Sequence, residues 1–239
     1  MDITAPDIKA NLREIRDRVA SAATAAGRDP GSVRLIAVSK YQSTAAIQQA
    51  IAAGQTAFGE NTVQEAMTRQ VLMTEPGTEW HFIGHLQTNK AKYLPGNFSW
   101  LHTLDSIKLA KKLSACAAAA GDRLKLLIQV NISKDPDKFG LLPDAVYPFV
   151  EEFLAADLPG VQLRGLMTIG RRDATDAERL HDFSGLHELR DACAGRFGAA
   201  YFRELSMGMS HDFETAIRAG ATMVRVGSAI FGARPVKCP

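Results

Sequence analysis

VRLIAVSK, residues 33–40, is a short apolar run rich in β-branched residues, and it sets the pattern that the rest of the chain repeats. Such a run is typical of a strand buried on both faces. The segment before it, residues 6–26, has apolar residues at helical spacing: Ile8, Leu12, Ile15 and Val19. The chain therefore begins with an amphipathic helix that leads into a buried strand.

Seven more runs of this kind follow, and a segment with helical periodicity separates each from the next. The further strand candidates are residues 56–61, 79–84, 100–104, 125–132, 161–170, 202–208 and 222–232. The helix candidates are residues 43–53, 61–73, 88–93, 106–120, 143–155, 174–195 and 211–219. Alternation of strands and helices indicates a parallel sheet with helical crossovers. Eight such units predict an α/β fold, a single (β/α)₈ TIM barrel over residues 1–239, with residues 6–26 as an extra N-terminal helix.

The alternative fold is a doubly wound open sheet. It would usually have fewer strands and a glycine-rich nucleotide turn. The sequence contains neither GxGxxG nor GxxxxGK[ST], so the barrel is favoured.

The composition is that of an ordinary soluble globular protein, with 46% hydrophobic and 23% charged residues. The net charge is +2 and no half of the chain carries a basic run, so we expect no nucleic-acid surface. The three cysteines show no metal spacing and no pairing pattern, which fits a reducing compartment. The N-terminus lacks the apolar core of a secretory signal, and no run approaches the ~20 apolar residues of a membrane span. We therefore expect a cytoplasmic protein.

Function in a barrel lies at the C-terminal ends of the strands, and the first strand ends in Lys40. Apolar surroundings lower the pKa of an amine, and a neutral amine attacks carbonyl groups. The alternative is a lysine that merely extends into solvent. For an isolated lysine this alternative would be the better interpretation. The residues at the other strand ends therefore decide between the two roles of Lys40.

Barrels often bind phosphate with the loops after strands seven and eight and a short extra helix. Here these loops are SMGMS and GSAIFG. Gly208 and Gly227 would allow backbone amides to approach a phosphate closely. Hydroxyl donors in the two loops are Ser206, Ser210 and Ser228. SAIFG is long enough for one helical turn. The helix candidate that follows SMGMS has Asp212 and Glu214 in its first turn, so we expect the loop amides, and not the start of that helix, to hold the anion. The alternative is that these residues only form tight turns.

Arg225 lies inside the apolar run MVRVG, where a charge needs a partner. Counted in steps of two, it shares a face with Met223 and Gly227, so it lies just below the predicted phosphate loops. A structural ion pair with a carboxylate of a neighbouring strand is the alternative. Amine, phosphate loops and arginine together specify a phosphorylated aldehyde or ketone. Pyridoxal 5′-phosphate (PLP) and the substrate of a Schiff-base sugar-phosphate aldolase both fit.

Six blocks carry a resemblance to a known family. They are IAVSK ending at Lys40, FGEN with VQEA at 58–66, HFIGHLQTNK at 81–90, GLMTIG at 165–170, SMGMSHDFETAI at 206–217 and VRVGSAIFGAR at 224–234. Along nearly its whole length the chain resembles the pyridoxal phosphate homeostasis proteins (the YggS/PROSC group). The resemblance implies a barrel similar to the N-terminal domain of alanine racemase, with PLP as a Schiff base on Lys40. It implies that Ser206, Gly208, Gly227 and Ser228 hold the phosphate, that Arg225 lies near the pyridine nitrogen, and that Asn61 and Met167 line the ring. Lys138 also matches a family lysine and is given no role.

The resemblance also bears on enzyme activity. Similar racemases add a β-domain and a second subunit, whereas only seven residues follow Gly232, so we expect neither a second domain nor a catalytic residue. His85 is the one candidate for a second acid/base group, and a rim hydrogen-bonding role is favoured for it. His81 and His85 are too far apart on a strand, about 13 Å, to share a metal.

We therefore predict a monomeric cytosolic protein that holds PLP and supplies it to apo-enzymes that depend on PLP. The alternatives are a weak PLP-dependent amino-acid racemase and a sugar-phosphate aldolase.

Overall fold

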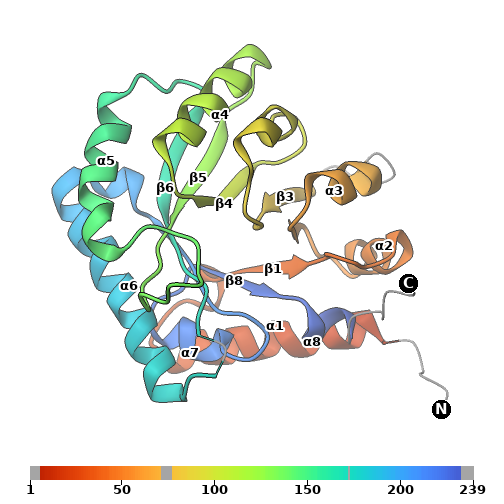
Figure 1. Cartoon of the computed structure of the whole chain (residues 1–239). Coiled ribbons are helices and arrows are strands. Elements are labelled where there is room, and N and C mark those ends of the chain that lie inside the picture. Colours follow the sequence, from red (N-terminus) through yellow and green to blue (C-terminus); the bar gives the residue numbers. More distant parts are fainter. Residues whose placement is uncertain (1–5, 71–76, 172, 233–239) are drawn as a thin grey trace.

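The computed structural model describes residues 6–70, 77–171 and 173–232, and in this part of the chain eight parallel strands close into a barrel (Figure 1). Each strand pairs with its neighbour in the chain, and β8 pairs with β1 to close the sheet. The strands are β1 (Arg34–Val38), β2 (Ala57–Glu60), β3 (Glu79–Phe82), β4 (Trp100–Leu104), β5 (Leu124–Gln129), β6 (Val161–Met167), β7 (Glu204–Ser206) and β8 (Met223–Val226). The predicted (β/α)₈ barrel is confirmed.

Helical segments connect the strands along the outside of the barrel. The α-helices are α1 (Ile8–Ala25), α2 (Thr44–Ala52), α3 (Val63–Gln70), α4 (Ile107–Ala119), α5 (Val146–Ala155), α6 (Asp176–Phe197), α7 (Phe213–Arg218) and α8 (Ser228–Phe231). The short 3₁₀ helices are η1 (Pro30–Ser32), η2 (Thr88–Tyr93), η3 (Pro143–Ala145) and η4 (Ala199–Tyr201). All the helix candidates of the sequence are found in place, and the end of the candidate 61–73 lies outside the described residues.

Two segments differ most from their sequence patterns, and the strands expected over 125–132 and 161–170 end earlier, at Gln129 and Met167. The crossover at residues 88–93 is a 3₁₀ helix, as is common for so short a connection. The strand expected over 222–232 ends at Val226, and the helical turn expected from SAIFG follows as α8. Apolar periodicity does not place that boundary, because β8 and α8 both contribute buried apolar side chains.

The N-terminal helix α1 ties together the elements that follow the last two strands. It packs against α7 and α8, and Arg18 Nε donates to Glu214 Oε1 of α7 over 3.0 Å. Asn11 Nδ2 donates to the carbonyl oxygen of Ile230 in α8 over 2.9 Å. The apolar face of α1 is buried: Ile8, Leu12, Ile15, Val19 and Ala23. This helix therefore supports the loops at which the sequence predicts a phosphate site.

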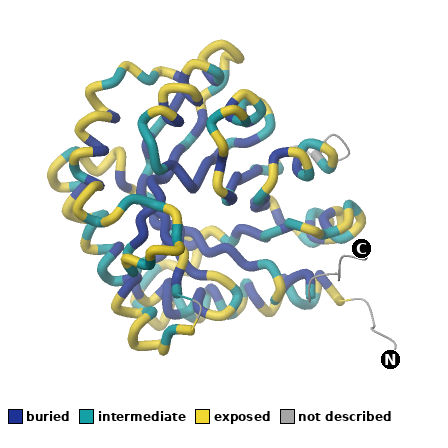
Figure 2. The backbone as a smooth tube through the Cα atoms, viewed as in Figure 1, coloured by how far each residue is buried: buried dark blue, intermediate teal, exposed yellow. Residues whose placement is uncertain are grey.

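The buried residues form two separate apolar regions. The larger one lies between the barrel wall and the surrounding helices, and Figure 2 shows buried strands inside a partly exposed helical layer. The smaller one fills the barrel itself and consists of Ile36, Ala57, Trp100, Leu127, Met167 and Met223. Polar side chains share this interior, because His81, His102, Ser206 and Arg225 are also buried.

Leu12→Ala is expected to lower the free energy of unfolding by about 2–5 kcal/mol, because this fully buried side chain of α1 would leave a cavity. Arg13→Ala, on the exposed face of the same helix, is the matched control and should change it by less than about 0.5 kcal/mol. Urea unfolding followed by circular dichroism measures both. Equal effects of the two substitutions would contradict a supporting role of this helix.

Candidate functional site

Lys40 lies in a tight turn at the C-terminal end of the barrel, which we call the mouth. β1 ends at Val38, and the backbone N–H of Gln42 donates to the carbonyl oxygen of Ser39 over 3.0 Å. Tyr41 has a φ of +64°, a left-handed conformation that residues other than glycine rarely adopt. Such backbone strain is concentrated at functional sites. Lys40 is half-buried in this turn.

The turn is fixed to the end of β2 by a buried carboxylate. Ser39 Oγ donates to Glu60 Oε1 over 2.7 Å, and Arg69 Nη2 of α3 lies 2.7 Å from Glu60 Oε2. Arg69 also donates to the carbonyl oxygen of Gln42, at 3.4 Å. Burial raises the pKa of Glu60, while Ser39 and Arg69 oppose that change. The ion pair therefore keeps a carboxylate charged inside the protein and holds the Lys40 turn in place.

The loops that follow β7 and β8 come together beside this turn. The backbone N–H of Gly227 donates to Ser210 Oγ over 3.2 Å, and a Cβ atom on Gly227 would lie 3.3 Å from Val38 of β1. Gly208 has a φ of +90°, and a Cβ atom there would come within 2.6 Å of the Cβ of Ala216. Glycine is therefore required at 208 and lets the backbones approach closely at 227. Ser228 begins α8, whose first amides have no acceptor within the helix.

Arg225 is buried at the end of the barrel interior nearest the mouth. Its Nη1 donates to Ser206 Oγ over 2.7 Å, and its Nη2 donates to the carbonyl oxygen of Thr168 over 2.8 Å. Burial lowers its pKa to about 10, and Asp212 opposes the shift, so the guanidinium stays charged at neutral pH. Among the described residues no carboxylate lies within 4.0 Å of it. The alternative of an ion pair with a neighbouring strand is thus not what the structure contains.

Ser206 lies deeper than the sequence pattern indicated. It is fully buried, and its Oγ contacts both Arg225 and, at 2.8 Å, Nδ1 of His102. As the last residue of β7 it faces the barrel interior, and the serine that reaches the loop after β8 is Ser210. The expected direct contact between Ser206 and a phosphate therefore does not fit this placement.

The other predicted site residues lie around the same end of the barrel. Asn61 directly follows β2, and its Oδ1 is buried without a hydrogen-bond partner among the described residues. Met167 ends β6 and belongs to the apolar interior. His85 stacks on Phe139, with ring centroids 4.0 Å apart, and its Nδ1 lies 3.7 Å from Asp105. Lys138 Nζ donates to the carbonyl oxygen of Gly170, in the loop after β6, over 3.2 Å.

His102 is a residue that the sequence patterns did not single out. It lies in β4 and is fully buried, with its Nε2 2.9 Å from Nδ1 of His81. The period of two in WLHTL places Trp100 and His102 on one face, and the pairing of β4 shifts register before Leu104, which packs in the outer apolar region. The sequence pattern thus indicates that Trp100 and His102 share a face. Whether this face points into the barrel depends on how the sheet closes.

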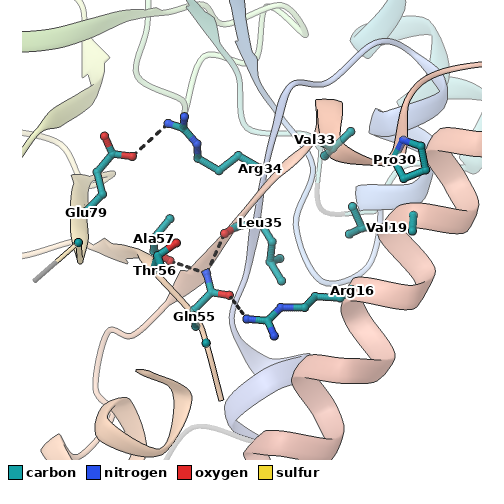
Figure 3. Close-up of a pocket in the computed structure, with 13 residues that line it drawn as sticks. Arg16, Val19, Pro30, Val33, Arg34, Leu35, Gln55, Thr56, Ala57 and Glu79 are labelled. Atoms are coloured by element: carbon teal, nitrogen blue, oxygen red, sulfur yellow. Dashed lines mark hydrogen bonds and ion pairs between the residues drawn. The ribbon is translucent and has the colours of Figure 1, made fainter. Parts of the chain in front are cut away.

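A groove of about 580 Å³ lies at the opposite end of the barrel, the base, between α1 and the first strands (Figure 3). Its polar side chains bind one another or the backbone. Arg16 Nη2 donates to Gln55 Oε1 over 3.2 Å, and Gln55 Nε2 donates to the carbonyl oxygen of Leu35 over 2.8 Å. Because barrel enzymes and binding proteins use the C-terminal end of the strands, the mouth is the candidate site.

The described residues show neither a membrane-spanning helix nor a cluster of metal ligands. None of their helices is long and apolar enough to cross a membrane. They also contain no group of three or more histidine, cysteine, aspartate or glutamate side chains that could hold a metal ion.

Residues 6–235 match the family described as alanine racemase, N-terminal domain. A pyridoxal phosphate homeostasis protein of Escherichia coli K12 is 42% identical over an alignment of 234 residues that covers 95% of this chain and 97% of that protein. A protein of the same name from Pseudomonas aeruginosa is 41% identical over 233 residues, 97% of this chain and 98% of that protein.

Solved structures agree with these matches. PipY of Synechococcus elongatus PCC7942, with PLP bound, is 37% identical and superimposes with a TM-score of 0.84 over 95% of this chain and 100% of its own. Alanine racemase from Corynebacterium glutamicum has a TM-score of 0.67 at 20% identity, over 95% of this chain and 63% of its own. The second likeness concerns the fold alone.

Arg69→Met is expected to lower the free energy of unfolding by about 3–5 kcal/mol, because it leaves Glu60 buried without its cation. The folded-state pKa of Glu60 is already raised and would rise further, so the loss should be full at neutral pH and shrink as the pH falls toward about 4. Arg69→Lys keeps the charge and is the control, with a smaller loss. Urea unfolding between pH 4 and 8 tests this, and a loss that does not depend on pH would contradict it.

Proposed function

We infer that this protein, which belongs to the alanine racemase N-terminal domain family and within it to the pyridoxal phosphate homeostasis proteins, binds PLP reversibly through Lys40 and takes part in PLP homeostasis. One observation carries the proposal. The strained turn of Lys40, the glycines of the β7 and β8 loops and the buried charge of Arg225 meet at one end of the barrel.

The residues present fit this cofactor. Arg225 is a buried cation without a carboxylate among the described residues, and Asn61 Oδ1 is a buried acceptor without a donor there. Gly208 and Gly227 stand where a side chain would crowd the neighbouring backbone. A ligand with an anionic end, an aromatic ring and an aldehyde would use all of these features.

When bound, PLP supplies an aldehyde that a lysine amine can attack reversibly and a ring that can act as an electron sink. In our proposal Lys40 binds the aldehyde carbon. Gly208, Ser210, Gly227 and Ser228 surround the phosphate, Arg225 donates to the pyridine nitrogen, and Asn61 and Met167 flank the ring. Ser206 positions Arg225 and does not touch the phosphate.

We further propose that the protein stores and delivers PLP without turning over amino acids. Arginine only donates hydrogen bonds, so it would leave the pyridine nitrogen unprotonated and weaken the electron sink. His85, the candidate for a second acid or base for which the sequence favours a hydrogen-bonding role at the rim, stacks on Phe139. We place this storage in the cytoplasm, in a monomer that supplies apo-enzymes.

The test is the absorption spectrum of purified protein with added PLP. Wild type should show a band in the near violet, and Lys40→Ala should abolish it because the amine that binds the aldehyde is gone. Lys138→Ala, at the rim lysine that binds Gly170, is the matched control and should keep the band. Borohydride reduction and peptide mass spectrometry should place the label on Lys40. Wild-type protein that stays colourless, or a label on Lys138 alone, would refute the proposal.

The family match to alanine racemase favours one second candidate, a weak amino-acid racemase. PLP-loaded protein incubated with L-alanine, with D-alanine measured over time, separates the two functions. Turnover that is robust and lost in Lys40→Ala would establish the racemase in place of the storage protein. The storage role predicts no turnover above the level of free PLP.

A further inference from the structure

Five side chains form a continuous polar chain through the barrel interior, from its base to its mouth. We call it the histidine chain, and its members are Glu79, His81, His102, Ser206 and Arg225. His81 Nε2 lies 3.3 Å from Glu79 Oε2, without good hydrogen-bond alignment. His81 Nδ1 is 2.9 Å from His102 Nε2. His102 Nδ1 is 2.8 Å from Ser206 Oγ, which is 2.7 Å from Arg225 Nη1.

The chemistry of the two ends fixes the direction of every hydrogen bond between them. Arginine can only donate, so Ser206 Oγ accepts from Arg225 and its own proton is donated to His102 Nδ1. The proton of a neutral His102 is then on Nε2 and is donated to His81 Nδ1. A neutral His81 likewise carries its proton on Nε2, where it faces the carboxylate of Glu79. The donations from Arg225 to Ser206, from Ser206 to His102 and from His102 to His81 thus all point away from the mouth.

The surroundings favour the neutral form of both histidines. Burial lowers the pKa of His81, although Glu79 opposes this shift, and lowers the pKa of His102 well below its ordinary value. The cations that face the pair from other strands are Arg34 of β1, Lys125 of β5 and Arg225 of β8, and each disfavours a further positive charge. The carboxylates are Glu79 on β3 and, near Arg225, Asp212 ahead of α7.

The opposite direction would leave the proton of Ser206 without an acceptor among the described residues. If the pair gained a proton, His102 would donate from Nδ1 to Ser206, which already accepts from Arg225. The buried Ser206 hydroxyl would then have lost the acceptor of its own proton. A buried donor without a partner costs about 1–3 kcal/mol. The neutral tautomers are therefore the ones in which Ser206 accepts from Arg225 while its own proton also has an acceptor.

We propose that His81 and His102 are positioning residues of the cofactor site, which hold Ser206 as an acceptor for Arg225 and so fix Arg225 for the pyridine nitrogen. This inference rests on the proposed function. It adds that binding at the mouth depends on side chains that do not touch the cofactor. The chain ends in Glu79, whose side chain is 25% exposed and lines the groove at the base.

The first test reads the tautomers directly, in protein without cofactor. The ¹⁵N chemical shifts of the histidine rings should assign the Nε2–H tautomer to both His81 and His102, unchanged between pH 6 and 8. An Nδ1–H tautomer of either ring, or titration of either in this range, would overturn the proposal.

The second test compares two replacements of His102. His102→Leu removes the acceptor of Ser206, and PLP affinity should fall on the order of tenfold, with a shifted absorption band of the bound cofactor. His102→Gln offers one acceptor and one donor at the end of a side chain of similar reach, and should restore most of the affinity. Met223→Leu, a conservative change in the apolar interior, is the control and should bind as wild type. Thermal unfolding confirms that each variant is folded.

The outcomes separate this inference from the function on which it rests. If wild type binds no PLP, the proposed function fails, whatever the tautomers are. If wild type binds PLP and His102→Leu binds it equally well, or His102→Gln is as weak as His102→Leu, the positioning role alone is refuted. A His102→Leu protein that does not fold leaves the decision to the tautomer measurement and to His102→Gln.

Discussion

The buried charge of Arg225 is the constraint on which the interior of this barrel depends. A guanidinium out of water needs hydrogen-bond acceptors, and in the described residues no carboxylate is close enough to serve. Acceptors come instead from Ser206 of β7 and from the carbonyl oxygen of Thr168, which directly follows β6. One cation thereby joins the ends of three neighbouring strands. The same contacts place its charge at the end of the interior that lies next to Lys40 and to the loops containing Gly208 and Gly227.

Because the buried Arg225 needs hydrogen-bond acceptors, the interior of the barrel is only partly apolar. Six apolar side chains fill part of the interior, and the remainder is a polar chain that passes from Arg225 through two histidines to Glu79. Glu79 in turn lies within 3.3 Å of Arg34 and Lys125. The positive charge near the mouth and the charged cluster at the base are therefore parts of one network, separated by neutral groups that can both donate and accept.

The arrangement of the mouth follows from two kinds of support outside the barrel. α1 holds α7 and α8 by contacts with Glu214 and Ile230. On the other side the Glu60–Arg69 pair fixes the turn that carries Lys40. The strained φ of Tyr41 persists because the buried Ser39 and the Gln42 hydrogen bonds determine the turn from both sides. The amine and the loops are thus positioned before any ligand arrives.

The sequence by itself determined the eight strands, their order, the extra N-terminal helix and the strand ends that carry Lys40, Gly208, Arg225 and Gly227, because apolar periodicity and local turn residues encode these features. Only the tertiary structure decided that Ser206 faces Arg225 and not the loops, that Ser210 reaches Gly227, and that His102 completes a chain through the barrel. Such contacts join residues as many as 104 positions apart. The physical reason is that a strand pattern tells which side chains share a face, whereas closure of the sheet decides which face is inside and which strands meet across it.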